Sequence, residues 1–486
     1  MILRELIRDL KEPKVIGSQE IEISGVECDS RRVAGGGLFI AVNGVNVDAH
    51  RFIGQVVAQG AAAVVCEHVP DDVADAEGVT WVVVANSQVA LAQLASAWYG
   101  HPSRELKLVG ITGTNGKTTC ATLLYELARL MGYKAGLLST VKNIVDTRES
   151  EAVQTTPDHL TLNRLLREMV DAGCDYAFME VSSHACAQHR IDGVTFAGGV
   201  FTNLTRDHLD FHKTVDNYIA AKKSFFDSLG SEAWALVNAD DVHGRVMVQN
   251  CRAAVSDYAL RQLATFKCHV IEERLDGTTL ELDGTELEVQ FTGRFNAYNL
   301  AAVYGAARLL GWEREQVLVK MSLLVPVSGR FQTFRSAEGV TAIVDYAHTP
   351  DALVNVLDTI NDVLQRTGGR VITVCGCGGN RDKGKRPIMA AEAARRSHQL
   401  ILTSDNPRNE RPADILDDML AGLDDEQKQA ALVIEDRAQA IRTACRLAGK
   451  GDVVLVAGKG HENYQEIEGV KHHFDDSEQV RLNLKL

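Results

Sequence analysis

The fold is decided by residues 106–119, which read Leu-Lys-Leu-Val-Gly-Ile-Thr-Gly-Thr-Asn-Gly-Lys-Thr-Thr. The apolar run at the start predicts a short buried strand, and the apolar spacing beyond the end predicts a helix. A glycine-rich turn between such a strand and helix lets backbone N–H groups approach phosphate oxygens, and the helix N-terminus adds a partial positive charge. Lys117 contributes a cation, and Thr118 contributes a hydroxyl that can ligate Mg²⁺. The stretch therefore predicts a loop that binds a nucleoside triphosphate.

The glycine spacing of this loop departs from the strict Walker A motif. That motif has a glycine five residues before Gly116, where this chain has Ile111. A tight turn without a nucleotide is the structural alternative, and the adjoining Lys117-Thr-Thr argues against it. We interpret the loop as a nucleotide site of slightly different spacing.

Length and composition indicate a globular protein of several domains. The 486 residues are too many for one hydrophobic core, and 45% hydrophobic with 24% charged residues is ordinary globular composition. A formal net charge of −14 argues against a nucleic-acid partner or an anionic membrane surface. The ten cysteines are scattered without a Cys-x-x-Cys pair, so we expect a reducing, cytoplasmic compartment. The N-terminus has no signal-peptide pattern and no run reaches membrane-spanning length, so we expect no membrane insertion.

Three α/β units are predicted along the chain, at residues 1–102, 103–333 and 334–486. In the first unit we predict strands at 21–26, 38–42, 62–66 and 81–84 and a helix at 89–99, ahead of a break at His101-Pro-Ser. In the second unit we predict strands at 106–111, 135–139, 176–181, 198–203 and 234–238. In the third we predict strands at 341–344, 371–375, 400–403, 432–434 and 453–456. Helices between the strands indicate a central parallel sheet with the nucleotide loop and a second, Rossmann-like sheet in the C-terminal unit.

Polar segments follow several of these strands. They occupy residues 180–184, 202–210, 345–350, 376–383, 405–408 and 458–462. Because ligands of parallel sheets bind beyond the carboxyl ends of the strands, we expect these segments to form the site.

Eight motifs, taken in order, resemble the Mur ligases, which are ATP-dependent amide ligases that build the peptidoglycan stem peptide. The motifs occupy residues 112–119, 180–184, 203–210, 218–222, 293–299, 329–331, 345–348 and 405–408. Any one of them is weak, but eight in this order across almost the whole chain are specific. In this family the loop is spaced as it is here, so Ile111 is no longer an exception. The last motif, Asp-Asn-Pro-Arg, is most similar to that of the member that adds meso-2,6-diaminopimelate to UDP-N-acetylmuramoyl-L-alanyl-D-glutamate.

The resemblance implies that ATP phosphorylates a substrate carboxylate to an acyl phosphate, which an amine then attacks. Cations must bring the anionic carboxylate and the anionic phosphate together. The implied catalytic residues are Lys117, Lys222 and His208. The implied ATP-binding residues are Gly113, Thr114, Asn115, Gly116, Lys117, Thr118, Thr119, Asn299, Arg330 and Asp345. The implied Mg²⁺ ligands are Thr118, Glu180, His208 and Lys222.

Lys222 is implied to be carbamylated. From the residues alone it is typical of a solvated helix lysine, just as Glu180 is typical of a capping acid and His208 of a loop histidine. Carbamylation converts the cation into a carboxylate-like anion that helps to hold a second Mg²⁺. The reaction requires a neutral amine, and therefore a lowered pKa of Lys222.

The nucleotide-sugar substrate is expected to span the first two units. Its implied contacts are Cys28, Ser30, Val45, Asn46, Val47, Gln154, Thr155, Thr156, Ser182, Gln188 and Arg190. Hydroxyls and amides suit sugar and diphosphate groups, and an arginine suits an anion. Val45 and Val47 are apolar where some relatives are polar, so we expect main-chain contact there.

The sequence also distinguishes diaminopimelate from lysine as the acceptor amino acid. Diaminopimelate differs from lysine by a second, distal carboxylate, for which Arg408 offers a bidentate fork and Arg381 a second positive partner. The predicted acceptor residues are Arg381, Asp405, Asn406, Pro407, Arg408, Gly458 and Glu462. Lysine is expected to be rejected because it would leave a guanidinium unpaired.

Two other functions are weighed against this one. The same chemistry with another acceptor, as in lysine addition or the related folylpolyglutamate synthetases, is disfavoured by Arg408 and by the whole N-terminal unit. A P-loop switch of the GTPase kind would usually have an Asn-Lys-x-Asp motif, which we do not find. We expect small-molecule substrates and a monomer.

Overall fold

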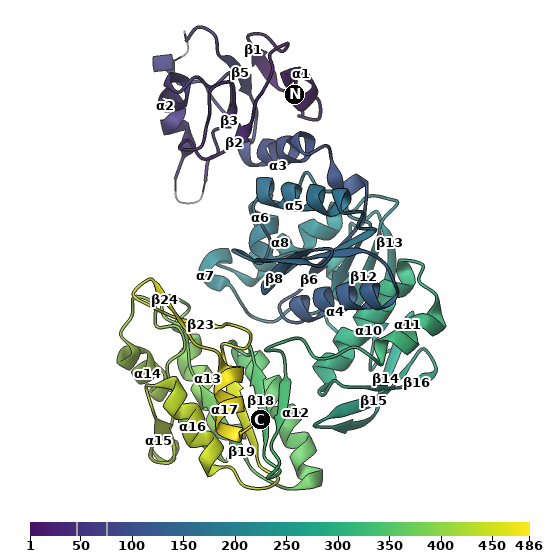
Figure 1. Cartoon of the computed structure of the whole chain (residues 1–486), viewed down its shortest axis with the longest axis vertical. Helices are drawn as coiled ribbons and strands as arrows, with labels where there is room; N and C mark the ends of the chain where they lie inside the picture. The colour runs from purple at the N-terminus through teal and green to yellow at the C-terminus, as the bar shows by residue number, and fades with distance from the viewer. Residues whose placement is uncertain (45–46, 74–75) are drawn as a thin grey trace.

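The computed structural model describes residues 1–44, 47–73 and 76–486. Three lobes follow one another along the long axis of the molecule, and the chain enters the central lobe after α3 (Ser87–Trp98) (Figure 1). Each lobe contains its own sheet flanked by helices, which confirms the predicted α/β class with three domains. Within these residues no helix is both long and apolar enough to cross a membrane. The ten cysteines are free thiols.

The N-terminal lobe has a five-stranded sheet in the order β1-β5-β4-β3-β2, parallel except for β1. The strands are β1 (Lys14–Ile16), β2 (Val26–Glu27), β3 (Leu38–Ile40), β4 (Ala63–Cys66) and β5 (Thr80–Val83). Before α3 lie α1 (Leu3–Leu6), η1 (Ala49–Phe52), α2 (Ile53–Ala58) and η2 (Asp71–Val73), and after it lies η3 (Pro102–Arg104). The predicted strand at 21–26 is wrong except at its last residue. Ile21 O instead accepts from Leu3 N–H, Ile23 N–H donates to Met1 O, and Glu22 forms an isolated antiparallel bridge with Ile2, so this segment binds the start of the chain.

The central lobe has an eleven-stranded sheet in the order β16-β15-β14-β13-β12-β11-β6-β10-β7-β8-β9. The strands are β6 (Lys107–Thr112), β7 (Ala135–Leu138), β8 (Lys142–Val145), β9 (Arg148–Glu151), β10 (Tyr176–Glu180), β11 (Gly198–Phe201), β12 (Trp234–Asn238), β13 (Ala254–Ala259), β14 (Phe266–Arg274), β15 (Gly277–Leu282) and β16 (Thr285–Val289). The strands predicted for this lobe, β12, β11, β6, β10 and β7, are parallel as predicted, and the parallel part continues through β13 and β14, which were not predicted. The edge strands were not predicted, and they are antiparallel because short turns join them to their neighbours.

Helices cover both faces of the central sheet. These are α4 (Lys117–Leu130), α5 (His159–Asp171), α6 (Ser183–Ala187), α7 (Leu209–His212), α8 (Val215–Asp227), α9 (Gly244–Met247), α10 (Arg294–Leu309) and α11 (Arg314–Met321). One core packs α4 and α10 under the sheet through side chains such as Leu123 and Leu300, and the other packs α5 and α8 above it through Leu162 and Phe225 (Figure 1). The central strand β6 is therefore buried on both sides, as its apolar run predicts.

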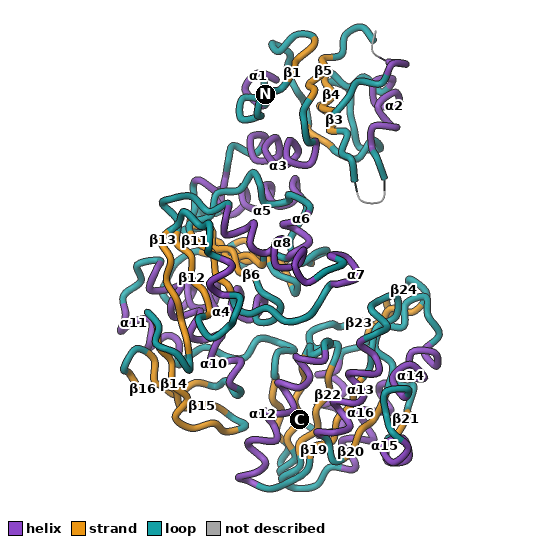
Figure 2. Tube along the Cα trace, turned by 180° about the vertical axis from the view of Figure 1, so that it is seen from behind, coloured by secondary structure: helices purple, strands orange, loops and turns teal. Residues whose placement is uncertain are grey.

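The C-terminal lobe has a six-stranded sheet in the order β17-β18-β22-β19-β20-β21, parallel except for β17. The strands are β17 (Gln332–Arg335), β18 (Thr341–Asp345), β19 (Val371–Cys375), β20 (Gln399–Leu402), β21 (Leu432–Val433) and β22 (Val453–Ala457). Its helices are α12 (Pro350–Thr367), α13 (Lys385–Arg396), α14 (Pro412–Leu420), α15 (Asp425–Ala430), α16 (Arg437–Leu447) and α17 (Asp476–Leu484), and a separate hairpin pairs β23 (Tyr464–Ile467) with β24 (Val470–His473). Figure 2 shows this lobe from behind; α12 and α13 pack on one face of its sheet, and α16 packs on the opposite face. The proposed domain division at 333/334 falls within β17, and the boundaries stay predictions.

Candidate active site

The nucleotide loop lies at the carboxyl end of β6, between the ends of β10 and β11. Its two inner glycines have positive φ, +149° at Gly113 and +86° at Gly116, which an L side chain rarely adopts. A Cβ on Gly113 would lie 1.9 Å from Thr202 Oγ1, and one on Gly116 would lie 2.4 Å from Asn299 Oδ1. Only glycine therefore fits at both positions, and the loop backbone lies against β11 and α10.

Side chains from α8 and from the segment that follows β11 hold the loop in this shape. Asn115 N–H donates to Asn203 Oδ1 at 3.0 Å, and Thr202 Oγ1 donates to Asn115 O at 2.6 Å. The hydroxyls of Thr114 and Tyr218 lie 3.0 Å apart. Tyr218, which is buried, belongs to one of the motifs noted above but was not predicted as a site residue.

Two lysines converge on one carbonyl of the loop. Lys117 Nζ donates to Gly113 O at 3.0 Å and to Thr114 O at 2.8 Å, and Lys222 Nζ donates to Gly113 O at 2.7 Å. Burial, followed by the nearby charge of Lys117, holds the pKa of Lys222 well below its usual range, and burial also lowers the pKa of Lys117. Lys222 is buried rather than solvated, so the interpretation from the residues alone is wrong for this side chain.

Glu180 ends β10 beside the loop and is buried. Its Oε1 accepts from Thr140 N–H at 2.7 Å, whereas Oε2 has no hydrogen-bond partner in the described part of the chain. A buried carboxylate oxygen without a donor is costly unless a cation neutralises it. Glu180 and the Thr118 hydroxyl therefore fit a hard cation such as Mg²⁺, which binds protein oxygens together with phosphates and waters.

His208 lies farther out, at the start of α7, with a positive φ of 53°. Its side chain is 42% exposed, and its Nε2 is 3.4 Å from Asp207 Oδ2. Its ring lies 4.9 Å from that of His184 and 6.3 Å from that of Tyr218. In the described ranges no three His, Cys, Asp or Glu side chains gather closely enough to hold a metal by themselves. Any metal here would need phosphate or water oxygens as further ligands.

The remaining predicted ATP residues connect the central and C-terminal lobes. Asn299, on α10, is buried against Gly116. Arg330 Nη2 donates to Thr118 Oγ1 at 3.1 Å, and its guanidinium lies 4.5 Å from the centre of the Tyr346 ring. Asp345 accepts from Phe331 N–H at 2.6 Å, and burial raises the pKa of Asp345 to about 6. Thr119, at the start of α4, is also buried.

The residues predicted to hold the muramoyl-dipeptide form one network beside Glu180. Thr156 Oγ1 donates to Glu180 O at 2.8 Å and accepts from Ser182 N–H at 3.0 Å. Thr140 Oγ1 donates to Thr155 Oγ1 at 3.1 Å. Arg190 Nη1 donates to Thr156 O at 2.8 Å, and its other donors reach Gln188 Oε1 and Gln154 Oε1.

Fewer contacts are seen for the residues of the N-terminal lobe that were predicted to bind the nucleotide-sugar. Ser30 is buried and Val47 is exposed, while Val45 and Asn46 lie outside the described residues. Cys28 packs against the same hydrophobic core as Leu160 of α5, and burial followed by the charge of Asp158 raises the pKa of Cys28 to about 11. This lobe therefore meets the central lobe close to the muramoyl network.

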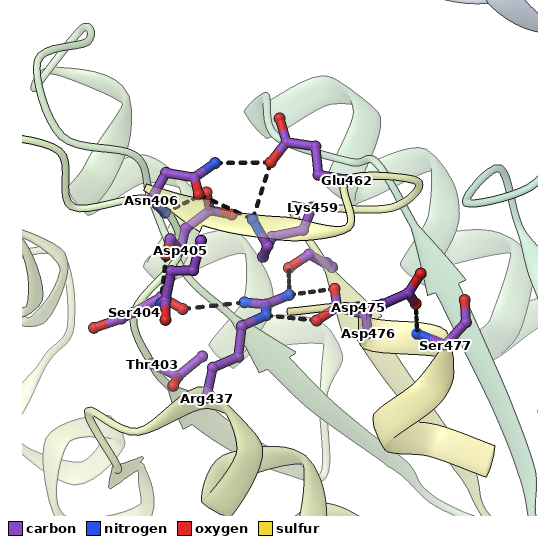
Figure 3. A network of polar contacts seen from close by, with 12 residues as sticks. Thr403, Ser404, Asp405, Asn406, Arg437, Lys459, Glu462, Asp475, Asp476 and Ser477 are labelled. Carbon is purple, nitrogen blue, oxygen red and sulfur yellow. Dashed lines mark hydrogen bonds and ion pairs between the residues drawn. The ribbon is translucent and has the colours of Figure 1, made fainter. Parts of the chain in front are cut away.

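Two loops of the C-terminal lobe form the predicted acceptor site, after β20 and after β22 (Figure 3). Asn406 Nδ2 donates to Glu462 Oε2 at 2.7 Å, which joins the two loops. Gly458 has a φ of +120°, and a Cβ there would lie 2.6 Å from Asp405 Oδ2. The two loops are thus packed against each other at the carboxyl edge of the sheet, as predicted.

A buried ion pair fixes these loops from beneath. Arg437 Nε and Nη2 bind both oxygens of Asp476 at 2.7 Å, and both side chains are buried. The same guanidinium donates to Ser404 O at 3.4 Å and to Ala457 O at 3.0 Å, the carbonyls that precede the two loops (Figure 3). Neither charge was singled out from sequence, because an arginine and an aspartate 39 residues apart carry no local signal.

Arg408 lies at the edge of the acceptor loops with its side chain 20% exposed. Its Nη1 donates to Gly379 O at 2.9 Å, and its Nε is 3.3 Å from Glu466 Oε2. Its φ is +52°, and its backbone pairs with β23 at Ile467. A Cβ on Gly379 would lie 1.9 Å from Pro407 O, so the turn is packed tightly there. Arg381 is exposed on the adjacent loop.

Fold and site together define a class of protein: a three-domain α/β enzyme in which a nucleotide loop lies beside a buried carboxylate, the buried Lys222 and the half-buried Lys117, with two packed polar loops on a neighbouring Rossmann-like lobe. Three family models match the chain in order: the Mur ligase family catalytic domain at residues 22–99, the Mur ligase middle domain at 111–307, and the Mur ligase glutamate ligase domain at 329–460. The chain belongs to the Mur ligase family.

Similarity to individual named proteins is more specific than the family match. The chain is 58% identical over 481 residues to the UDP-N-acetylmuramoyl-L-alanyl-D-glutamate–2,6-diaminopimelate ligase of Bacteroides fragilis, covering 99% of both chains. It is 57% identical to the ligase of the same name from Bacteroides thetaiotaomicron, again over 99% of both. A solved structure of a ligase of that name is similar with a TM-score of 0.69 and 32% identity, over 100% of this chain and 99% of the other.

Proposed function

We propose that the protein is an ATP-dependent ligase that adds meso-2,6-diaminopimelate to UDP-N-acetylmuramoyl-L-alanyl-D-glutamate in peptidoglycan synthesis. The observation that carries this proposal is the 58% identity, over nearly the whole chain, to a ligase of that name. The assembled nucleotide loop, carboxylate network and acceptor loops supply the chemistry that such a reaction needs.

In the first step a carboxylate oxygen of the muramoyl-dipeptide attacks the γ-phosphorus of ATP, and ADP leaves. Lys117 and the N-terminus of α4 offset the negative charge that gathers on the transferred phosphoryl group. Arg190, held by Thr156 and Gln188, orients the dipeptide beside the loop. The acyl phosphate is therefore formed next to Glu180.

In the second step the acceptor amine attacks the acyl carbon and inorganic phosphate leaves. The amine must arrive as a free base, and it loses a further proton as the amide forms. Asp405 and Glu462 lie close enough for the charge of Asp405 to act on Glu462, so this site suits an acceptor with an ammonium group. Arg408 contacts Gly379 O and Glu466 with part of its guanidinium group. Its other N–H groups suit the distal carboxylate of diaminopimelate.

Mg²⁺ is the proposed metal, held by Thr118, Glu180 and the phosphates, and when bound it neutralises the charge of the reacting phosphates. His208 and a carbamylated Lys222 are proposed as further ligands. Support for the carbamate comes from the burial and lowered pKa of Lys222, which favour the neutral amine. We further propose that the enzyme acts as a monomer in the cytoplasm, where the nucleotide substrates are made.

The test is release of phosphate from ATP, measured with and without UDP-muramoyl-dipeptide and with diaminopimelate or lysine as acceptor. We expect release only when both the dipeptide and diaminopimelate are present. Arg408→Ala should reduce the preference for diaminopimelate over lysine by about 10- to 100-fold, because a charged hydrogen-bonded contact is lost. Arg411→Ala, a change of an exposed arginine nearby, is the control and should leave the preference unchanged. A preference retained in Arg408→Ala would contradict the proposed role.

A further inference from the structure

Lys459 is a fully buried lysine between the two glycines of the loop after β22. Its side chain is 0% exposed, although a lysine is rarely buried without a specific partner. Its Nζ donates to Asn406 Oδ1 at 3.0 Å and to Glu462 Oε2 at 3.0 Å, and lies 5.4 Å from the centre of the Tyr464 ring. The ammonium group thus lies behind the two residues that join the acceptor loops (Figure 3).

This contact fixes which way the Asn406 amide faces. Its Oδ1 accepts from Lys459 Nζ and also from Glu466 N–H at 2.9 Å. Both lone pairs of the amide oxygen are thereby used, so Nδ2 must be the atom that faces Glu462. One N–H of Nδ2 binds Glu462 Oε2, and a primary amide has a second N–H to offer.

The same contact gives the two carboxylate oxygens of Glu462 different surroundings. Oε2 accepts from both Asn406 Nδ2 and Lys459 Nζ, while the other oxygen points away from them (Figure 3). The side chain of Glu462 is 15% exposed. Burial and the neighbouring charge of Asp405 raise the pKa of Glu462, whereas Lys459 opposes that rise. Lys459 therefore favours an anionic Glu462 with one oxygen available.

We propose that Lys459 is a positioning residue that sets the polarity of the acceptor site, holding Glu462 as an acceptor for a substrate ammonium and Asn406 as a donor for a substrate carboxylate. An acceptor and a donor side by side match the ammonium and carboxylate of an amino acid. This inference rests on the proposed function, because it assigns the specificity of the same acceptor site. Lys459 itself does not touch the substrate.

The first test is Lys459→Met, which keeps an unbranched side chain out to Cε and removes the ammonium. We expect the KM for meso-diaminopimelate to rise about 10- to 100-fold, the cost of losing hydrogen bonds to charged groups, while the KM for ATP stays unchanged. Lys471→Met is the matched control, since Lys471 lies 4.2 Å from the centre of the same Tyr464 ring but is exposed, and it should leave both constants unchanged.

A double-variant cycle separates positioning from general support of the fold. If Lys459 acts through Glu462, then Lys459→Met/Glu462→Gln should have a KM for diaminopimelate within about 3-fold of Glu462→Gln alone. The double variant removes both charges of the Lys459–Glu462 ion pair, so it carries the test even if Lys459→Met does not fold.

Two outcomes would overturn the role of Lys459: an unchanged KM for diaminopimelate in Lys459→Met, or a double variant with a KM more than about 3-fold above that of Glu462→Gln. Both outcomes differ from the result expected if the proposed function were wrong. If it were wrong, the wild-type enzyme itself would show no phosphate release that depends on diaminopimelate.

Discussion

Buried charge defines the site at the scale of single residues. Lys222 and Glu180 are buried ionisable side chains and Lys117 is half-buried, and burial lowers the pKa of both lysines. The two lysines donate to carbonyls of the nucleotide loop, and Glu180 accepts from Thr140 N–H, so each is held at a fixed place beside the loop. Ligands and metal ions would complete the contacts that the protein leaves open, such as the free oxygen of Glu180.

Lys222→Ala should reduce ligase activity by about 100-fold, because the variant loses a proposed metal-ligand group. A small carboxylic acid added to the assay should restore part of the activity by occupying the space of the carbamate. Lys223→Ala, at the next residue of α8, is the control, since Lys223 pairs with Asp227 on the outer side. Full activity of Lys222→Ala without added acid would show that the lysine has no such role.

His159 should make the folded protein sensitive to acid. Burial lowers its pKa from 6.5 to about 4, and its Nε2 lacks a partner in the described part of the chain. The unfolded chain therefore takes up the proton first, so stability is complete above pH 6.5 and falls as the pH drops toward 4, by up to about 3 kcal/mol. His159→Leu should flatten this part of the curve of unfolding free energy against pH, measured with urea. His269→Leu, at an exposed strand position, should leave the slope as it is in the wild type.

At the scale of elements, α4 joins the nucleotide site to the central core. The helix begins at the loop and ends before Gly132, and its buried side chains lie in the core below the sheet. Gly116 and Gly132, which flank it, have nearly the same positive φ, +86° and +89°. Only Gly116 lies against another side chain, because a Cβ on Gly132 would meet nothing within 4 Å.

This pair of glycines gives a controlled test. Gly132→Ala should cost about 1 kcal/mol of unfolding free energy, the backbone penalty alone, and keep nucleotide binding. Gly116→Ala adds a clash with Asn299, so it should also abolish the rise in melting temperature that an ATP analogue with Mg²⁺ produces in the wild type. Equal effects of the two substitutions on nucleotide binding would mean that the loop tolerates a side chain.

At the scale of the whole molecule, each lobe has its own hydrophobic cores. Those of the C-terminal lobe receive Leu275 and Phe295 from the central lobe, and the N-terminal core receives Leu160. Polar contacts between the central and C-terminal lobes include Arg330 to Thr118 and Arg366 Nη2 to Glu273 O at 2.8 Å. The lobes are thus connected without sharing one continuous core.

Calorimetry should therefore resolve more than one unfolding transition. An ATP analogue with Mg²⁺ at about 100 times its Kd should stabilise the central lobe by about 2.7 kcal/mol, and the transition that contains this lobe should move to higher temperature. Hydrogen exchange of residues 107–130 would identify that transition. A single transition that moves as a whole would show that the three lobes unfold together.

The sequence by itself determined the features that depend on local pattern. The loop at 106–119, the strands at 234–238 and 371–375, and the helix after Gly116 follow from apolar spacing and glycine position, which act over a few residues. The edge strand β9 of the central sheet was not predicted, because its side chains are exposed and give no apolar signal.

Only the tertiary structure decided which distant side chains meet. It brought Lys222 to Gly113, 109 residues away, and Lys459 to Asn406, 53 residues away, and it buried both lysines. The Arg437–Asp476 pair beneath the acceptor loops arises in the same way. The reason is physical: strand order in a sheet sets these neighbours, and the cost of burying a charge depends on partners that lie far away along the chain.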